Sequence, residues 1–162
     1  MAFQKECIFC EIVKGTSHAH IVYESRSHLA FLSIFPISPA VTVVIPKKHC
    51  SGDVLSLQNL DYIKLLKCAK VVAQALKIGL KAERVAMVAE GMMINHAHIK
   101  LFPLIIGAAS PEYGASIPGD FHIDYPGYLT TLEGPRCTNQ QLSEWQAQII
   151  EVGGAQSSNV KP

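Results

Sequence analysis

The segment Ile94–Pro103 constrains the fold more than any other stretch, because its side chains alternate in character. One side carries imidazole, ammonium and phenyl groups, from His96, His98, Lys100 and Phe102, and the other is aliphatic, from Ala97, Ile99 and Leu101. A period of two is typical of a β-strand with one face packed inward. Alternate residues lie about 7 Å apart along a strand. Such a row suits an anionic ligand, which a neutral imidazole can attack and a fixed positive charge can neutralise. An edge strand with outward polar residues would show the same alternation.

Composition indicates one compact domain. A chain of 162 residues, 49% hydrophobic and 17% charged, can bury a proper core. The net charge of +1 argues against electrostatic binding of nucleic-acid polymers, although a small phosphorylated ligand remains compatible with it. The five cysteines are odd in number and scattered, so a disulfide framework is not expected. We therefore expect a reducing compartment such as the cytoplasm.

The sequence predicts neither a secretory signal nor a membrane span. The first six residues are polar rather than signal-like, and the longest apolar run, Leu29–Pro46, is interrupted by Pro36 and Pro39. Two short strands joined by a turn explain this run better than a spanning helix does.

The remaining pattern predicts an α+β domain over residues 1–152, followed by a loose tail over 153–162. Strands are expected at 21–24, 28–32, 41–45 and 84–89, and the last of these pairs with the central segment as an antiparallel hairpin. Ser56 is expected to cap a long helix that ends at a left-handed Gly79. Its predicted buried stripe comprises Leu57, Leu60, Leu65, Cys68, Val72 and Leu76. Residues 104–137 read as an irregular segment with one strand at 128–132. Thr138 is expected to cap a final helix that buries Leu142, Trp145 and Ile149.

Two cysteines near the N-terminus are the first chemical feature of the chain. Cys7 and Cys10 are spaced so that both thiols can reach one metal ion, and a redox motif has the same spacing. Pro46 is expected to end a strand and to place His49 at its carboxyl edge, where His49 could meet the two cysteines. The neighbouring Cys50 is expected to point elsewhere.

The other histidines offer weaker candidates. His18 and His20 are expected to be surface residues in the loop that precedes the first strand. His122 and Asp124 fall in the irregular segment and are only remote candidates for catalysis.

Five short motifs occur in an order that resembles the histidine triad (HIT) family, zinc-containing branch. They span residues 7–103, with residues 104–152 as a C-terminal extension. They are Cys-Ile-Phe-Cys-Glu-Ile-Val-Lys-Gly, Leu29-Ala30-Phe31, Ser38-Pro39, Val44-Ile45-Pro46-Lys47-Lys48-His49 and His96-Ala97-His98. The resemblance implies a HIT-like fold with a five-stranded antiparallel sheet, one long helix, a C-terminal helix and a homodimer.

Related zinc-containing branches imply that four residues hold a structural zinc ion, namely Cys7, Cys10, His49 and His96. Two thiolates and two imidazoles form a closed tetrahedral set, which leaves no open position for water. The metal would therefore fasten the N-terminal segment to the motif histidines rather than take part in the chemistry.

The second motif histidine is the family's nucleophile, which corresponds to His98. A backbone carbonyl, in the family that of the first motif histidine, would fix its tautomer so that an unprotonated nitrogen can attack the α-phosphorus of a nucleotide. Apart from the resemblance, Lys100 is expected to hold a phosphate oxygen as a fixed positive charge. The expected nucleotide-binding residues are Ile8, Phe9, Ile12, Phe31 and Ser33.

Three positions depart from the family pattern. Lys100 stands where hydrolases carry histidine and the transferase and phosphorylase branches carry glutamine, and lysine is a poor proton donor at neutral pH. Val41 stands where many members have a further histidine, and Ser33 where an acidic residue holds the ribose hydroxyls.

The first hypothesis is a nucleotide hydrolase or nucleotidyltransferase that forms a nucleotidyl-histidine. The alternative is a HIT scaffold that binds a phosphorylated ligand without turnover, and a third is a small zinc protein that makes protein contacts through residues 104–137.

Overall fold

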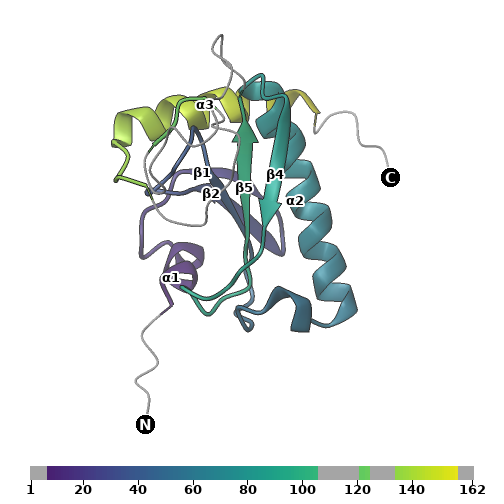
Figure 1. Ribbon diagram of the computed structural model, residues 1–162. Helices are drawn as coiled ribbons and strands as arrows, with labels where there is room; N and C mark the ends of the chain where they lie inside the picture. The colour runs from purple at the N-terminus through teal and green to yellow at the C-terminus, as the bar shows by residue number, and fades with distance from the viewer. Residues whose placement is uncertain (1–6, 106–120, 125–133, 157–162) are drawn as a thin grey trace, which may run out of the picture.

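A five-stranded sheet organises the part of the chain that the structure describes. The computed structural model describes residues 7–105, 121–124 and 134–156, with side chains as far as residue 151. The strands are β1 (Ile21–Glu24), β2 (His28–Leu32), β3 (Thr42–Pro46), β4 (Arg84–Val88) and β5 (Ile99–Leu104), and the helices are α1 (Ile8–Lys14), the 3-10 helix η1 (Val54–Ser56), α2 (Asn59–Gly79) and α3 (Asn139–Gln156). The strand order is β1-β2-β3-β5-β4, and every neighbouring pair is antiparallel. The predicted α+β class and antiparallel sheet are confirmed (Figure 1).

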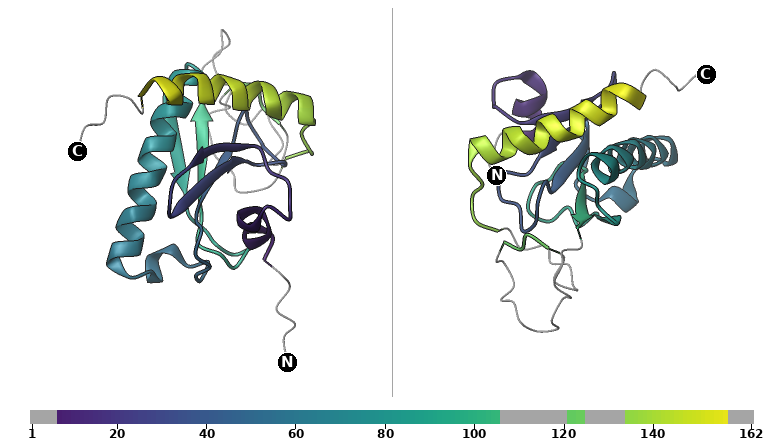
Figure 2. Two further views of the ribbon diagram at one scale, coloured as in Figure 1. Left: turned by 180° about the vertical axis from the view of Figure 1, so that it is seen from behind. Right: turned by 90° about the horizontal axis from the view of Figure 1, so that it is seen from above.

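The two faces of the sheet pack against different helices. On one face the main core joins the sheet to α2 and α3, through residues that include Ala30, Val44, Ile99, Leu65 and Trp145. On the other face a smaller cluster, consisting of Phe9, Leu29, Phe31, Val43 and Ile45, joins the sheet to α1. Alternation of side chains along each strand produces this division. Figure 2 shows α1 and α2 on opposite sides of the sheet.

The predicted alternation around the motif is correct, but the boundaries of the strand are not. β5 begins at Ile99, so His96 and His98 precede it, and their side chains are only 0% and 2% exposed rather than presented on a polar face. Ile99 and Leu101 face α2, as the alternation predicts. Burial of the two imidazoles is possible because both are hydrogen-bonded to backbone carbonyls.

The long helix differs from its prediction at both ends. It begins at Asn59, and Ser56 instead belongs to η1, whose cap is the Asp53 side chain. Leu60, expected in the buried stripe, is exposed, whereas the later stripe residues Leu65, Cys68, Val72 and Leu76 are buried as predicted. Gly79 is helical, and the residue with a left-handed backbone is Lys81, at φ 53°. A Cβ on Gly79 would lie 2.7 Å from the carbonyl oxygen of Gln148, so this glycine permits close contact between α2 and α3.

The C-terminal helix starts where the sequence predicts. The Thr138 hydroxyl oxygen accepts a hydrogen bond from the Gln141 N–H at 3.2 Å, which caps the helix, and Leu142, Trp145 and Ile149 are buried. The helix continues to Gln156, so residues 153–156, expected to belong to the tail, are helical. The strand predicted at 128–132 lies outside the described residues. Among the described residues, no helix combines the length and the apolar composition needed to cross a bilayer.

Two glycines bring the loop after β3 into contact with the loop between β4 and β5. Gly91 has φ 68°, and a Cβ on it would collide with the backbone carbonyl of Gly52. The same loops are joined by hydrogen bonds from Gly52 N–H to Asn95 Oδ1, at 2.8 Å, and from Ala97 N–H to Cys50 O, at 3.2 Å. Because one loop carries His49 and the other carries His96, this contact fixes the two histidines relative to one another.

Gly91→Ala is expected to destabilise the fold by roughly 3 kcal/mol or more, because backbone atoms on both sides would have to separate. Gly15→Ala is the matched control. Gly15 has a similar φ of 75°, but a Cβ added there would meet no atom within 4 Å, so its cost is only the left-handed backbone, on the order of 1 kcal/mol. Urea denaturation of both variants measures the difference. Equal losses of stability would mean that the loop contact contributes nothing.

Candidate metal and nucleophile site

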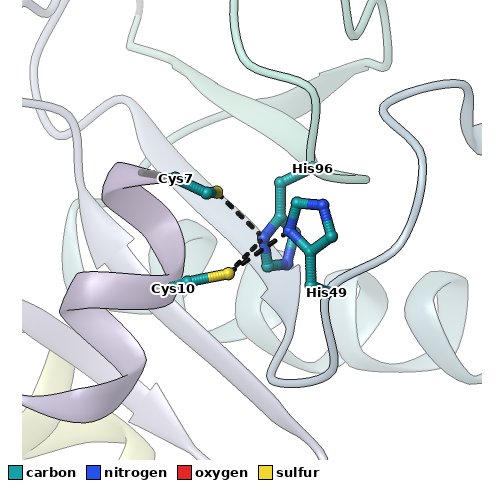
Figure 3. A group of neighbouring side chains, drawn as sticks. All are labelled: Cys7, Cys10, His49 and His96. Atoms are coloured by element: carbon teal, nitrogen blue, oxygen red, sulfur yellow. Dashed lines mark hydrogen bonds between the residues drawn. The ribbon is translucent and has the colours of Figure 1, made fainter. Parts of the chain in front are cut away.

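Four side chains from three parts of the chain come together at one point. Cys7 caps the N-terminus of α1, Cys10 lies in its first turn, His49 follows β3 and His96 precedes β5. Their ligand atoms all lie within 4.8 Å of one another, and no other such group of three or more cysteine, histidine or acidic residues occurs among the described residues. Figure 3 shows both thiols directed at the imidazoles.

The distances fit a tetrahedral metal ion. Cys7 Sγ lies 3.4 Å from His96 Nδ1, and Cys10 Sγ lies 3.3 Å from His49 Nδ1 and 3.6 Å from His96 Nδ1. A zinc ion with bonds of about 2.3 Å to sulfur and about 2.0 Å to nitrogen would hold those two atoms about 3.5 Å apart. The residues present therefore fit zinc in both ligand type and spacing.

The surroundings orient these ligands. The His96 Nε2–H donates to the carbonyl oxygen of Pro46 at 2.9 Å, which leaves Nδ1 free to act as a ligand. Desolvation lowers the pKa of His96 and keeps it neutral. Desolvation and the neighbouring Cys7 raise the pKa of the Cys10 thiol, and a bound cation would reverse that effect by stabilising the thiolate.

His98 lies beside this cluster with one nitrogen already occupied. Its Nδ1–H donates to the carbonyl oxygen of His96 at 2.8 Å, so the unprotonated nitrogen is Nε2. Burial lowers the pKa of His98. Both factors favour a neutral imidazole with an available lone pair at neutral pH, which is the form that a nucleophile requires.

Phe9 links the two motif histidines to the apolar side of the site. Its ring lies edge-on to His96, His98 and Phe31, with centroids 5.8, 5.3 and 5.4 Å away. Both imidazoles therefore face α1. Ile12 and Ile94 pack at the margin of the same cluster, and Ile8 is exposed. Phe9, Phe31 and Ile12, three of the residues expected to contact a nucleotide, thus lie in one apolar cluster, and Ile94, which was not predicted, joins them.

The positions that depart from the family pattern also lie on this face. Lys100 pairs with Val43 on one side and with Val88 on the other, so it shares a face with the apolar cluster. Val41 is buried against Ile37 and Phe102. The Ser33 hydroxyl accepts a hydrogen bond from the Phe35 N–H at 3.2 Å, so it is engaged in the turn that follows β2.

The C-terminal segment covers that turn from outside. Cys137 N–H donates to Ile34 O at 2.9 Å, Gly134 N–H to Phe35 O at 3.3 Å, and His122 N–H to Ile37 O at 2.9 Å. His122 therefore lies beside this turn through its backbone. No sequence signal indicates this contact, because an irregular segment has no period from which a partner can be inferred.

The structure also places His20 and Cys50, two residues for which the sequence predicted the surroundings. His20, expected at the surface, is buried and has an Nε2 without a hydrogen-bond partner, while its neighbour His18 is exposed and lies edge-on to it at 5.0 Å. Ala19 and Ile21, on either side of His20, pack against the apolar cluster. Cys50 is not one of the four residues of the cysteine–histidine cluster and packs against the main core.

Comparison with known proteins agrees with this geometry. The family model described as HIT domain matches residues 14–104. An uncharacterised HIT-like protein of Saccharolobus solfataricus is 33% identical over 103 residues, which is 60% of this chain and 73% of that one. An adenosine 5'-monophosphoramidase of Schizosaccharomyces pombe is 28% identical over 142 residues, covering 85% and 96% of the two chains.

Solved structures share the fold along almost the whole chain. A hypothetical histidine triad nucleotide-binding protein of Sulfolobus tokodaii superposes with a TM-score of 0.75 at 24% identity, covering 95% of this chain and 96% of that one. A zinc-bound histidine triad family protein of Mycobacterium smegmatis gives a TM-score of 0.67 at 21% identity, covering 96% and 98%. From the match to the family model and from these relatives, the chain belongs to the HIT family.

Proposed function

We propose that this protein is a nucleotide hydrolase or nucleotidyltransferase of the phosphoramidase type, acting through a nucleotidyl-His98 intermediate. The observation that carries the proposal is the hydrogen bond from His98 Nδ1–H to His96 O at 2.8 Å. Because this hydrogen bond occupies the Nδ1–H, the other ring nitrogen, Nε2, keeps an unprotonated lone pair that can attack phosphorus. The relative named adenosine 5'-monophosphoramidase supports an adenine nucleotide with a phosphorus–nitrogen bond as the substrate class.

In the first step, His98 Nε2 attacks the α-phosphorus, a P–N bond forms to the imidazole, and the bond to the leaving amine breaks. The amine departs with a proton taken from solvent. Lys100 holds the phosphate oxygens as a fixed positive charge and Phe9, Phe31, Ile8 and Ile12 contact the nucleoside. In the second step, water or another acceptor displaces the imidazole.

A zinc ion at Cys7, Cys10, His49 and His96 would supply structural anchoring only. The four residues fill the tetrahedral set, so no position is left for substrate. By holding α1 against the segment that precedes β5, the cluster keeps Phe9 beside His98.

The five cysteines are free thiols in the structure, and we propose a reducing compartment, the cytoplasm, as the protein's location.

The direct test is incubation of native protein with adenosine 5'-phosphoramidate. Intact-protein mass spectrometry is expected to detect one adenylyl group per chain, and peptide mapping to place it on His98, while AMP and ammonia appear in solution. The absence of both adduct and turnover would reject the enzymatic proposal. Native mass spectrometry of the same sample reports the zinc content and whether two chains associate, as expected for a homodimer.

One set of observations favours the second candidate, a scaffold that binds a phosphorylated ligand without turnover. Val41 is apolar and buried, the Ser33 hydroxyl is engaged with Phe35, and Lys100 carries no proton-accepting group. Each of these features removes a contact that a hydrolase would use. Tight AMP binding by calorimetry, without an adduct, would support this candidate.

A further inference from the structure

Glu90 is the acidic group that the proposed reaction leaves unused. Its carboxylate oxygen Oε1 is buried and has no hydrogen-bond partner. A buried carboxylate oxygen without a donor is costly, so each such group requires an explanation. Glu90 follows β4 and immediately precedes Gly91, whose backbone is held by the contact with Gly52.

Glu90 and His98 each lie two residues beyond Val88–Lys100, the last pair of β4 and β5. β4 and β5 pair without a shift from Arg84–Leu104 to Val88–Lys100. When that register is continued by two residues, Glu90 falls opposite His98 and on the same face. Side chains directly opposite in an antiparallel pair have Cβ atoms about 5 Å apart. Burial is the main reason that the pKa of His98 is lowered, and of the two nearby charges Lys100 lowers that pKa further while Glu90 opposes the shift.

The proposed second step requires a group that accepts a proton from water, and the neighbours of His98 offer few. The Lys100 ammonium has no lone pair. His96 donates from Nε2 to Pro46 O and directs Nδ1 at the cysteine sulfurs, so both of its nitrogens are engaged. Phe9 has no acceptor, and His98 Nε2 is itself bonded to phosphorus at this stage. Of these described residues, only Glu90 has a free acceptor.

We infer that Glu90 is the general base that activates water for breakdown of the nucleotidyl-His98 intermediate. This inference depends on the proposed function. In the step, a water oxygen forms a bond to phosphorus, the P–Nε2 bond breaks and its electron pair returns to His98. One water proton passes to the Glu90 carboxylate, which later releases it to solvent. Lys100 stabilises the negative charge on phosphorus throughout, and Glu90 takes over the acid–base work that lysine cannot perform.

The test separates the two chemical steps with adenosine 5'-phosphoramidate as the probe. In Glu90→Gln, adduct formation on His98 is expected to proceed within about threefold of the wild-type rate, because the nucleophile is intact. Breakdown of the adduct is expected to slow by about 100-fold or more, the usual effect of removing a general base. Quenched-flow sampling with intact mass measurement would then find the adenylyl adduct accumulating. Glu83→Gln, at an exposed glutamate next to β4, is the control and should behave as wild type.

Three results would overturn the inference. A Glu90→Gln adduct that breaks down at the wild-type rate would reject the role of Glu90 while leaving the proposed function intact. Equal slowing of both steps, with a lower melting temperature, would assign Glu90 a structural role. An absence of adduct on His98 in both the wild type and the variant would reject the proposed function and the base together. Glu90→Asp, which keeps the carboxylate but shortens its reach, should recover part of the breakdown rate if the inference is correct.

Discussion

His98→Ala is expected to lose turnover of adenosine 5'-phosphoramidate by roughly 10⁴-fold or more, because the atom that forms the covalent bond is removed. His98 Nε2 is the attacking atom, and neighbouring groups cannot replace it, since His96 has both nitrogens engaged. The loss should appear in kcat, with AMP binding reduced far less. Steady-state assays with calorimetric titration of AMP measure the two effects separately.

His18→Ala is the matched control, because His18 is exposed and lies outside the site. It should retain wild-type turnover and zinc content. His98→Ala should also retain zinc, since the four cluster residues are untouched, and this excludes a trivial loss of fold. A His98→Ala protein with wild-type turnover would show that another residue is the nucleophile.

The second large effect concerns the metal cluster. Removing zinc, by chelation or by Cys10→Ser, is expected to cost about 4 kcal/mol when zinc is present at roughly 1,000 times its dissociation constant. In a domain of this size that loss lowers the melting temperature by roughly 8 to 16 °C. The reason is geometric, because Cys7 and Cys10 join the N-terminal end of α1 to the two histidines, while Phe9, Ile12 and Val13 pack along the helix against the smaller apolar cluster.

Cys137→Ser provides the comparison, since Cys137 lies outside the cluster and packs against the main core. It should bind one zinc ion per chain by elemental analysis and respond to chelator as the wild type does. The Cys10→Ser melting temperature should not change further when chelator is added. A wild-type protein that binds no zinc, or whose melting temperature ignores chelator, would contradict the assignment of a structural metal.

Alternation predicted the strands, and the spacing of Cys7 and Cys10 predicted that both thiols could reach one metal ion, for physical reasons that apply locally. Side chains two residues apart share a face, so the separation of Ile99 and Leu101 from Lys100 could be inferred without coordinates. The meeting of His49 with the cysteines needed more, because contact between distant segments is not a property of either segment. Pro46, as the end of a strand, made that meeting possible, and the order of the family motifs implied it; the ligand distances agree with it.

What could not be predicted from the sequence depends on tertiary contact. Gly79 reads as a helix stop because glycine readily adopts a left-handed backbone. In the structure it is helical, and its lack of a side chain allows the backbone of Gln148 in α3 to approach closely. His20 reads as a surface residue because histidine is polar and its segment precedes the first strand, but it is buried in the fold. The start of α2 was misplaced because Ser56 is a good cap in isolation, whereas the structure includes it in the preceding η1.

The hydrogen bond from Gln146 Nε2 to the carbonyl oxygen of Ile21, at 2.7 Å, has a consequence for truncation. Among the described strands β1 is the outermost on its side of the sheet, and an uncovered outer strand can recruit strands from other molecules. Deleting α3 would leave that carbonyl open and strip Leu142, Trp145 and Ile149 from the main core. Shortened versions that stop at the family motifs would therefore tend to aggregate, and expression should extend through residue 156.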